Sequence, residues 1–149
     1  MSILPLMIKN RQGVFIYIQT ADHCLNLKGT LKFSIVIEID HNASFGSGAF
    51  ALIYDESLLR LDSFSIGKGL LGISNASETG LLRFNAVSTS GVNGFLELGR
   101  GQFTGIAIGE SELSLRILDS PADSLGGILS DITVVNGSIK VGQFNSLSF

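Results

Sequence analysis

The chain has 149 residues, of which 45% are hydrophobic and 15% charged, and its formal net charge is −3. The ten lysines and arginines are scattered among thirteen acids, so they form no basic stripe of the kind that nucleic-acid binding requires. The longest apolar runs fall well short of the roughly 20 residues of a membrane-spanning helix, so no membrane insertion is expected. A single cysteine, Cys24, excludes a disulfide within the chain.

Short alternating segments rich in Ile, Val, Phe and Leu predict β-strands throughout the chain. In order, these segments are VFIYIQ (14–19), LKFSIVIEID (31–40), SGAFALIY (47–54), LDSFSI (61–66), LLRFNAV (81–87), FLELGRGQF (95–103), SELSLRIL (111–118) and GSIKV (137–141). Turn signals separate them, which is typical of an all-β antiparallel sandwich. The only helical structure expected is one short turn at ESLL, with Asp55 as its cap.

No repeat, linker or shift in composition divides the chain. We therefore expect a single domain over residues 1–149, with an N-terminal extension through about residue 13. The opening MSILPLMIKN is apolar but has no basic segment before its apolar stretch, so a signal peptide is not expected.

Alternation along two of these strands assigns their faces. The core side is predicted to hold Gly48, Phe50, Leu52, Tyr54, Leu82, Phe84 and Ala86. The outward side is predicted to hold Ser47, Ala49, Ala51, Ile53, Arg83 and Asn85. A sheet face of small and aliphatic side chains is either covered or exposed for a purpose, so this outward set is a candidate binding surface.

The segment IGKGLLG, residues 66–72, has the glycine spacing of a dinucleotide-binding fingerprint. That fingerprint needs a following helix whose N-terminus holds the pyrophosphate. The next residues, ISNASETG, have no helical periodicity and predict a loop, and Lys68 is not followed by the Ser or Thr of a P-loop. Nucleotide binding is therefore not expected.

Few side chains could begin a catalytic or metal site. His23 and Cys24 point to opposite sides of an extended chain, which favours a surface histidine and a buried cysteine, and His41 stands alone. Three acids bracket a turn without the pattern of a calcium loop and are interpreted as solvated: Asp119, Asp123 and Asp131. No catalytic residue, metal ligand or cofactor is predicted.

Several landmarks follow one another between Gly29 and Val141. Gly29 opens a strand of alternating Val and Ile in GTLKFSIVIEI, and a strand ending in Tyr-Asp and a leucine turn follows in FALIYDESLLRLDSFSIGKGLL. Next come LLRFNAVS, the segment GESELSL and a closing NGSIKV. In this order and spacing the chain resembles a cohesin domain, and the YDxxxL turn is the most specific of the landmarks.

The resemblance implies a nine-stranded jelly-roll sandwich that is not an enzyme and that recognises a dockerin module through the sheet containing the strand before Tyr-Asp. It also implies an extracellular or cell-surface location, and turn conformations for the glycines of IGKGLLG. Cohesins that pair with cellulosomal enzymes often carry Asn and Asp at the positions matching Ser47 and Ala49. Because these polar partners are missing here, a dockerin that presents Ser or Thr hydroxyls is not the expected partner.

Two alternatives stay open. A self-assembling structural subunit could use the apolar ends MSILPLMIK and FNSLSF to add strands to a neighbour's sheet, although the same ends could pack on their own sandwich. A carbohydrate-binding module would share the fold, but its flat platforms use exposed Trp and Tyr, and this chain has no Trp and two Tyr.

Overall fold

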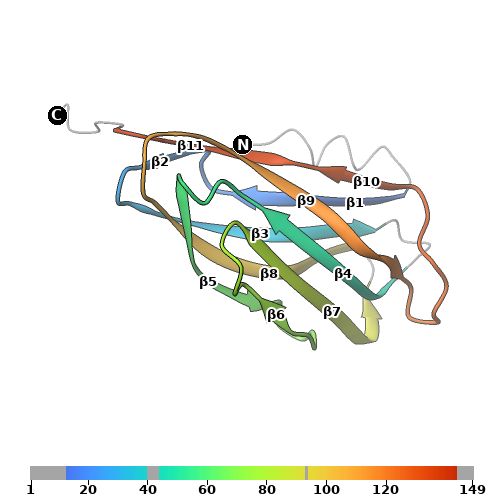
Figure 1. Ribbon diagram of the computed structural model, residues 1–149. Helices are drawn as coiled ribbons and strands as arrows, with labels where there is room; N and C mark the ends of the chain where they lie inside the picture. The colour runs from blue at the N-terminus through green and yellow to red at the C-terminus, as the bar shows by residue number, and fades with distance from the viewer. Residues whose placement is uncertain (1–12, 40–43, 93, 144–149) are drawn as a thin grey trace.

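The computed structural model describes residues 13–39, 44–92 and 94–143 as two β-sheets packed face to face (Figure 1). In spatial order, the five-stranded sheet contains β10 (Ile132–Val135), β1 (Val14–Thr20), β3 (Thr30–Ile39), β8 (Gly94–Gly105) and β5 (Leu59–Ile66). The six-stranded sheet contains β2 (Cys24–Asn26), β11 (Gly137–Gly142), β9 (Gly109–Ala122), β4 (Phe45–Ile53), β7 (Leu81–Val92) and β6 (Ser74–Asn75). The described residues form no helix.

The chain crosses repeatedly between the two sheets. Strands β3 and β8 lie in the five-stranded sheet, whereas β4, β7 and β9 lie in the six-stranded sheet, so β3 to β4, β7 to β8 and β8 to β9 are all crossings. The strand pairs are antiparallel except β1 with β10 and β2 with β11. This arrangement confirms the predicted antiparallel jelly-roll sandwich.

The main core lies between the sheets, because each strand turns alternate apolar residues toward the opposite sheet. β3 contributes Phe33, Ile35, Ile37 and Ile39, and β4, β7 and β9 contribute Phe50, Leu52, Leu82, Phe84, Ala86, Leu113 and Leu115. The Phe33 and Phe103 rings stack with their centroids 4.7 Å apart. Tyr54 meets the Phe103 ring edge-on at 5.1 Å, so the start of the YDxxxL turn is fixed in this core.

All eight predicted strands are present, and the structure adds β2, β6 and β10. The described residues thus form eleven strands rather than the nine that the resemblance implies. The difference comes from short elements, since β2 has three residues and β6 has two. Most of the N-terminal extension and both apolar ends fall outside the described residues, as does His41.

The ESLL segment makes one turn, as predicted. The amides of Leu58 and Leu59 both donate to the Asp55 carbonyl, at 3.1 and 2.9 Å. The Asp55 carboxylate accepts hydrogen bonds from the Ser57 hydroxyl and, at 2.9 Å, from the Ser57 amide, and these bonds lower its pKa. Asp55 therefore caps the turn, which accounts for the acid of the Tyr-Asp pair in structural terms.

The glycines of IGKGLLG provide a turn and a close backbone approach. The Leu70 amide donates to the Gly67 carbonyl at 3.1 Å, and Gly69 has a φ of 83°, which a side chain would disfavour. A Cβ on Gly72 would lie 2.0 Å from the carbonyl oxygen of Asn85 in β7. The glycines therefore serve the path of the chain, as the resemblance implies.

The structure tests the predictions made for Cys24 and Asp123. Cys24 is exposed, so the prediction that it is buried is wrong. In β2 it is Leu25 that turns into the core, which leaves its neighbour Cys24 on the outside. Asp123 lies in a turn, as predicted, and its carboxylate accepts hydrogen bonds from the backbone amides of Leu125 and Gly127 at 2.9 and 2.8 Å.

No helix among the described residues is long and apolar enough to cross a bilayer.

Candidate functional site

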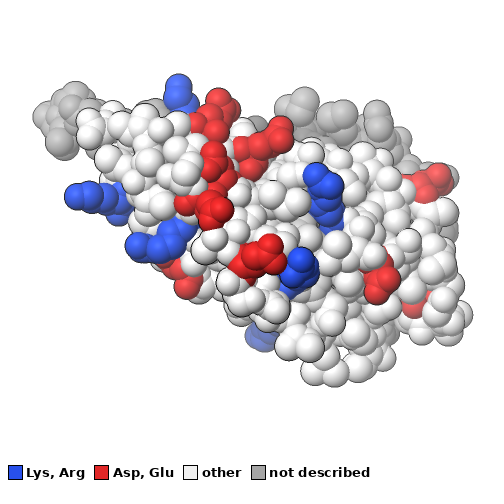
Figure 2. All heavy atoms as spheres, in the orientation of Figure 1, with Lys and Arg blue, Asp and Glu red and all other residues white. Residues whose placement is uncertain are grey.

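The side of the six-stranded sheet that faces away from the core is turned toward the viewer in Figures 1 and 2. We call this surface, over β9, β4, β7 and β6, the front face. The six predicted site residues all belong to it: Ser47, Ala49, Ala51, Ile53, Arg83 and Asn85. The register brings them together, because Ala49 lies opposite Asn85 and Ala51 opposite Arg83.

One of the six residues is not available to solvent. Ala51 is only 3% exposed, so the expectation that its side chain faces solvent is wrong. Its strand β4 is central, and Ala51 lies between Arg83 of β7 and Arg116 of β9 in the register. The methyl group of Ala51 therefore lies below the two longer side chains and is not available to contact a partner.

The front face is more apolar than the six predicted residues indicate. Of the ten exposed large hydrophobic residues in the described part of the chain, five lie on it: Ile53, Leu71, Ile73, Val87 and Leu118. Ile73 is 73% exposed and Leu118 is 51% exposed. Alternation already contained part of this signal, because Val87 shares the side of Arg83 and Asn85, and Leu118 shares the side of Arg116. Ile73 lies in a segment without alternation and had no such signal.

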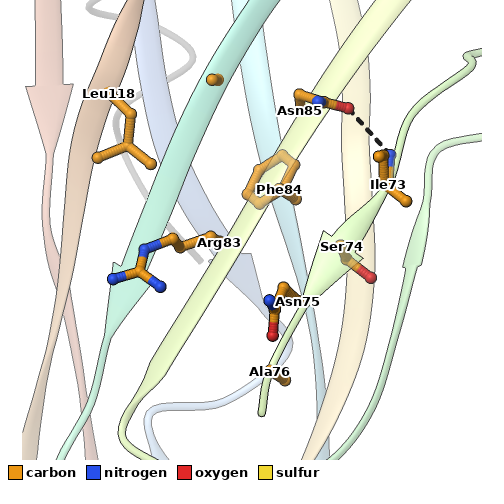
Figure 3. A pocket seen from close by; sticks show the side chains of 9 residues that line it. Ile73, Ser74, Asn75, Ala76, Arg83, Phe84, Asn85 and Leu118 are labelled. Carbon is orange, nitrogen blue, oxygen red and sulfur yellow. Dashed lines mark hydrogen bonds between the residues drawn. The ribbon is translucent and has the colours of Figure 1, made fainter. Parts of the chain in front are cut away.

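Two of these five residues, Ile73 and Leu118, line a hollow of about 530 Å³ (Figure 3). Leu118 of β9 and Ile73, next to β6, lie at its two sides (Figure 3). Ala49 also lines it, on β4, which lies between β9 and β7 in the sheet. The β4–β9 register shifts at Ala49, which pairs with Asp119 and leaves Leu118 at the irregularity. Such a bulge lets neighbouring residues of one strand lie toward the same side, and Leu118 and Asp119 are indeed both exposed.

Asn85 connects one side of the hollow to β7 by hydrogen bonds. Its side-chain oxygen accepts a hydrogen bond from the backbone amide of Ile73 at 2.9 Å (Figure 3). The Ile73 carbonyl in turn accepts a hydrogen bond from the backbone amide of Asn85 at 3.0 Å. Leu71 and Val87 exchange two further backbone hydrogen bonds, at 2.9 and 2.7 Å. Asn85 is therefore a positioning residue, because it holds exposed Ile73 against β7.

The charges on the front face are few and unevenly placed. Arg83 lies 3.8 Å from Glu78, and both side chains are more than half exposed, so this ion pair is weak. Arg116 makes no ion pair with the part of the chain that the structure describes. Figure 2 shows most acidic side chains gathered left of the centre of the view, and a few basic and acidic groups set in a mostly uncharged surface over the rest. The face therefore combines exposed aliphatic groups with two arginines that have no strong partner among the described residues.

The front face offers contact surface rather than reactive groups. Among the described residues, no three His, Cys, Asp or Glu side chains converge in a way that could hold a metal ion. The two tyrosines, Tyr17 and Tyr54, are 6% and 8% exposed, so neither offers a flat ring for stacking on a sugar. The chemistry available here is burial of aliphatic groups together with hydrogen bonding by two guanidinium groups.

No family model and no curated protein matches the chain. Solved structures do match its fold. The seventh ScaB type I cohesin from Pseudobacteroides cellulosolvens has a TM-score of 0.75 at 18% identity, over 92% of this chain and 97% of that chain. The chain has the cohesin fold. A non-cellulosomal cohesin from the archaeon Archaeoglobus fulgidus has a TM-score of 0.71 at 16% identity, over 87% and 91% of the two chains.

A third structure with this fold was solved together with its partner. The OlpA cohesin of Clostridium thermocellum, solved in a cohesin–dockerin complex, has a TM-score of 0.74 at 11% identity, over 87% of this chain and 99% of that chain. The fold is shared although few residues are identical. The chemistry of the front face in this chain must therefore be worked out from its own residues.

Proposed function

We propose that the chain is a non-catalytic protein-binding module that recognises a dockerin-like or other protein partner through its front face. The observation that carries the proposal is the concentration of five exposed large hydrophobic residues on this one face. Contiguous exposed apolar surface is uncommon on a protein without a partner and marks interaction sites. The cohesin fold supports the same conclusion, since the OlpA cohesin with this fold was solved bound to a dockerin.

The residues of the front face also indicate what kind of partner fits. Ser47 and Ala49 offer few hydrogen bonds, and the Asn85 oxygen is already used by the Ile73 amide. A partner that buried several hydroxyl groups here would leave them unsatisfied, at a cost of about 1–3 kcal/mol each. We therefore propose a partner that presents mainly aliphatic side chains to Leu118, Ala49 and Ile73. We further propose that the two proteins meet outside the cell or at the cell surface.

A pair of matched variants tests this proposal. The immobilised domain first captures proteins from a culture of the producing organism, and the captured partner is then purified and its affinity measured by calorimetry. Ile73→Asp is expected to lower that affinity at least 10-fold, because it places a carboxylate in the apolar contact. Ile108→Asp makes the same change at a residue that is 61% exposed in the loop between β8 and β9, and it is expected to leave the affinity unchanged.

Both isoleucines are exposed, so neither substitution is expected to change the free energy of unfolding by more than about 0.5 kcal/mol. Denaturation in urea checks this point. If Ile73→Asp folds normally and the partner binds it as tightly as the unchanged domain, the front face is not the binding surface.

A further inference from the structure

The front face has a regular order along β4 that defines the chemistry of its partner. Three outward residues of β4 follow one another two positions apart: Ala49, Ala51 and Ile53. Each lies in a row of residues across the sheet. In the register the Ala49 row holds Asp119 and Asn85, and the apolar Leu118 and Ile73 line the hollow together with Ala49. The Ala51 row carries Arg116 and Arg83, and the Ile53 row carries Ser114 and Leu81.

The middle row forms a cradle for an anionic group. Arg83 and Arg116 both lie opposite Ala51, one on each neighbouring strand, so their backbones are about 10 Å apart. Between them is only the buried methyl group of Ala51, and the Arg83 side chain extends from β7 toward β4 (Figure 3). Guanidinium groups hold carboxylates by paired hydrogen bonds, and an acid of the partner could approach both arginines from above the methyl group.

Neither arginine is strongly engaged within the described residues. The Glu78 contact of Arg83 is long, at 3.8 Å, and involves two exposed side chains. A carboxylate delivered by a partner could replace it at little cost, because exposed ion pairs contribute about 0–1 kcal/mol. The other acid near the hollow, Asp119, lies in the Ala49 row rather than beside the two arginines. The two arginines are therefore confined to the middle row, with Leu118 and Ile73 at the hollow on one side of it and Ile53 on the other.

The dimensions of the face match an α-helix lying along β4. The hollow extends from β9 to β6, a distance of three strand spacings or about 14 Å, and a helix with its side chains is about 10–12 Å wide. Successive rows are two residues apart on β4, or about 6.8 Å, whereas residues four apart on a helix are about 6 Å apart along its axis. One side chain of the helix can therefore meet each row.

Resting on the function proposed above, we infer that the partner segment is an amphipathic helix with an aliphatic residue at position i, Asp or Glu at i+4 and an aliphatic residue at i+8. The first aliphatic residue enters the hollow between Leu118 and Ile73. The acid is held between Arg83 and Arg116. The second aliphatic residue packs on Ile53. The shape and charge of the front face thus require an acid at only one position of the partner helix.

The test selects binders without assuming which natural partner exists. A yeast-displayed library of a small three-helix scaffold, randomised on one helix face, is sorted against the folded domain. Binders of the front face are recognised by their loss of binding to Ile73→Asp. Among these we expect an acid enriched at one fixed position between two aliphatic positions, and binding that weakens as salt is raised.

Variants of the arginines then locate the acid. Arg83→Gln and Arg116→Gln are each expected to lower the affinity of these binders about 10-fold or more, whereas Arg100→Gln, at an exposed arginine of the five-stranded sheet, leaves it unchanged. Replacing the binder's acid by its amide is expected to cause a similar loss on the unchanged domain and little further loss on the two variants. This non-additivity shows direct coupling.

Two outcomes overturn the inference, and they can be told apart. Front-face binders without acid enrichment, or with affinities insensitive to both Arg83→Gln and Arg116→Gln, contradict the carboxylate cradle but leave the proposed function intact. A selection in which every binder tolerates Ile73→Asp contradicts the front face as a binding surface, and the proposed function fails together with the inference.

Discussion

The two outer faces of the sandwich both carry apolar side chains outside the main core, but they differ in how these meet solvent. On the five-stranded sheet, Phe15, Tyr17 and Val36 form a separate cluster and are at most 6% exposed. We call this side, over β10, β1, β3 and β8, the back face. On the front face, Ile73 and Leu118 are more than half exposed. Apolar groups that are already buried contribute to folding, whereas exposed ones can contribute to binding.

Polar contacts show the same difference. On the back face, the Tyr17 hydroxyl donates to Glu38 at 2.7 Å, and Glu97 pairs with Arg100 at 3.3 Å. On the front face, Arg116 makes no ion pair within the described residues, and Arg83 makes only a long one. These back-face groups are paired within the chain, whereas the two front-face arginines have no strong partner among the described residues. Substitutions on the back face should therefore change stability, and substitutions on the front face should change affinity.

The largest effect is expected for Phe15→Ala. Removal of a buried phenyl ring leaves a cavity and typically costs 3–5 kcal/mol, so we expect the free energy of unfolding to fall by about 3 kcal/mol. Phe95→Ala is the matched control, because Phe95 belongs to the same sheet but is 55% exposed, and it should cost less than about 1 kcal/mol. Urea denaturation measures both. An equal loss for the two variants would show that the back-face cluster adds nothing special to stability.

Leu118→Asp is expected to have the next largest effect, on affinity rather than stability. It places a carboxylate in the apolar hollow, and we expect the partner's affinity to fall about 30-fold, or about 2 kcal/mol. Leu125→Asp makes the same change in the loop after β9, at a residue that is 94% exposed, and should leave the affinity unchanged. Calorimetry with the purified partner compares them. If the Leu118→Asp variant is strongly destabilised but its folded fraction binds the partner normally, the assignment of the front face to binding rather than stability is wrong.

Tyr17→Phe is expected to have a smaller effect, again on stability. It removes the hydrogen bond to Glu38 and keeps the ring, so the free energy of unfolding should fall by about 1–2 kcal/mol with no change in affinity. Chemical denaturation at pH 8 measures the loss. A drop in partner binding without a drop in stability would assign Tyr17 to a binding role instead.

The same tyrosine predicts a dependence on alkaline pH. Burial, followed by the hydrogen bond and the charge of Glu38, raises the pKa of Tyr17 above its ordinary value of about 10. Its contribution to stability is therefore fully present below pH 10 and is lost as the pH rises further, because the unfolded chain ionises first. Denaturation curves between pH 8 and 11 should show a steeper loss for the unchanged domain than for Tyr17→Phe. Parallel curves contradict this assignment.

Asn85→Ala is expected to have the smallest effect. It removes the acceptor of the Ile73 amide, so stability should fall by about 0.5–1 kcal/mol and affinity by a few-fold as Ile73 loses its support. Hydrogen exchange at the Ile73 amide should become faster. Asn75→Ala is the control, because the Asn75 oxygen only accepts local hydrogen bonds from Ser77. Unchanged exchange at Ile73 in Asn85→Ala would show that Asn85 does not position it.

Most of the sandwich could be predicted because its signals are local. Alternation alone located eight strands and correctly placed Phe50, Leu52, Leu82 and Phe84 in the core. The strands that it missed are two to four residues long, too short for a periodic pattern. Their formation depends on the neighbouring strand, as when β10 pairs with β1.

The candidate site could be predicted only in part, for a related reason. Alternation states which side of a strand a residue occupies, but exposure depends on residues that are distant in the sequence. Ala51 is buried because Arg83 and Arg116 lie on either side of it, and their positions follow from the register. Ile73 joins the site through a hydrogen bond to Asn85, twelve residues away. Neither relation has a pattern in the sequence.

Photo-crosslinking tests the central claim most directly. The photoreactive residue p-benzoylphenylalanine is incorporated in place of Ile73 on the front face or in place of Phe95 on the back face, both of which are more than half exposed. The domain is then irradiated with its purified partner. We predict a covalent adduct for the domain labelled at position 73 and none for the domain labelled at position 95. An adduct at position 95 alone, or equal adducts at both positions, would contradict binding through the front face.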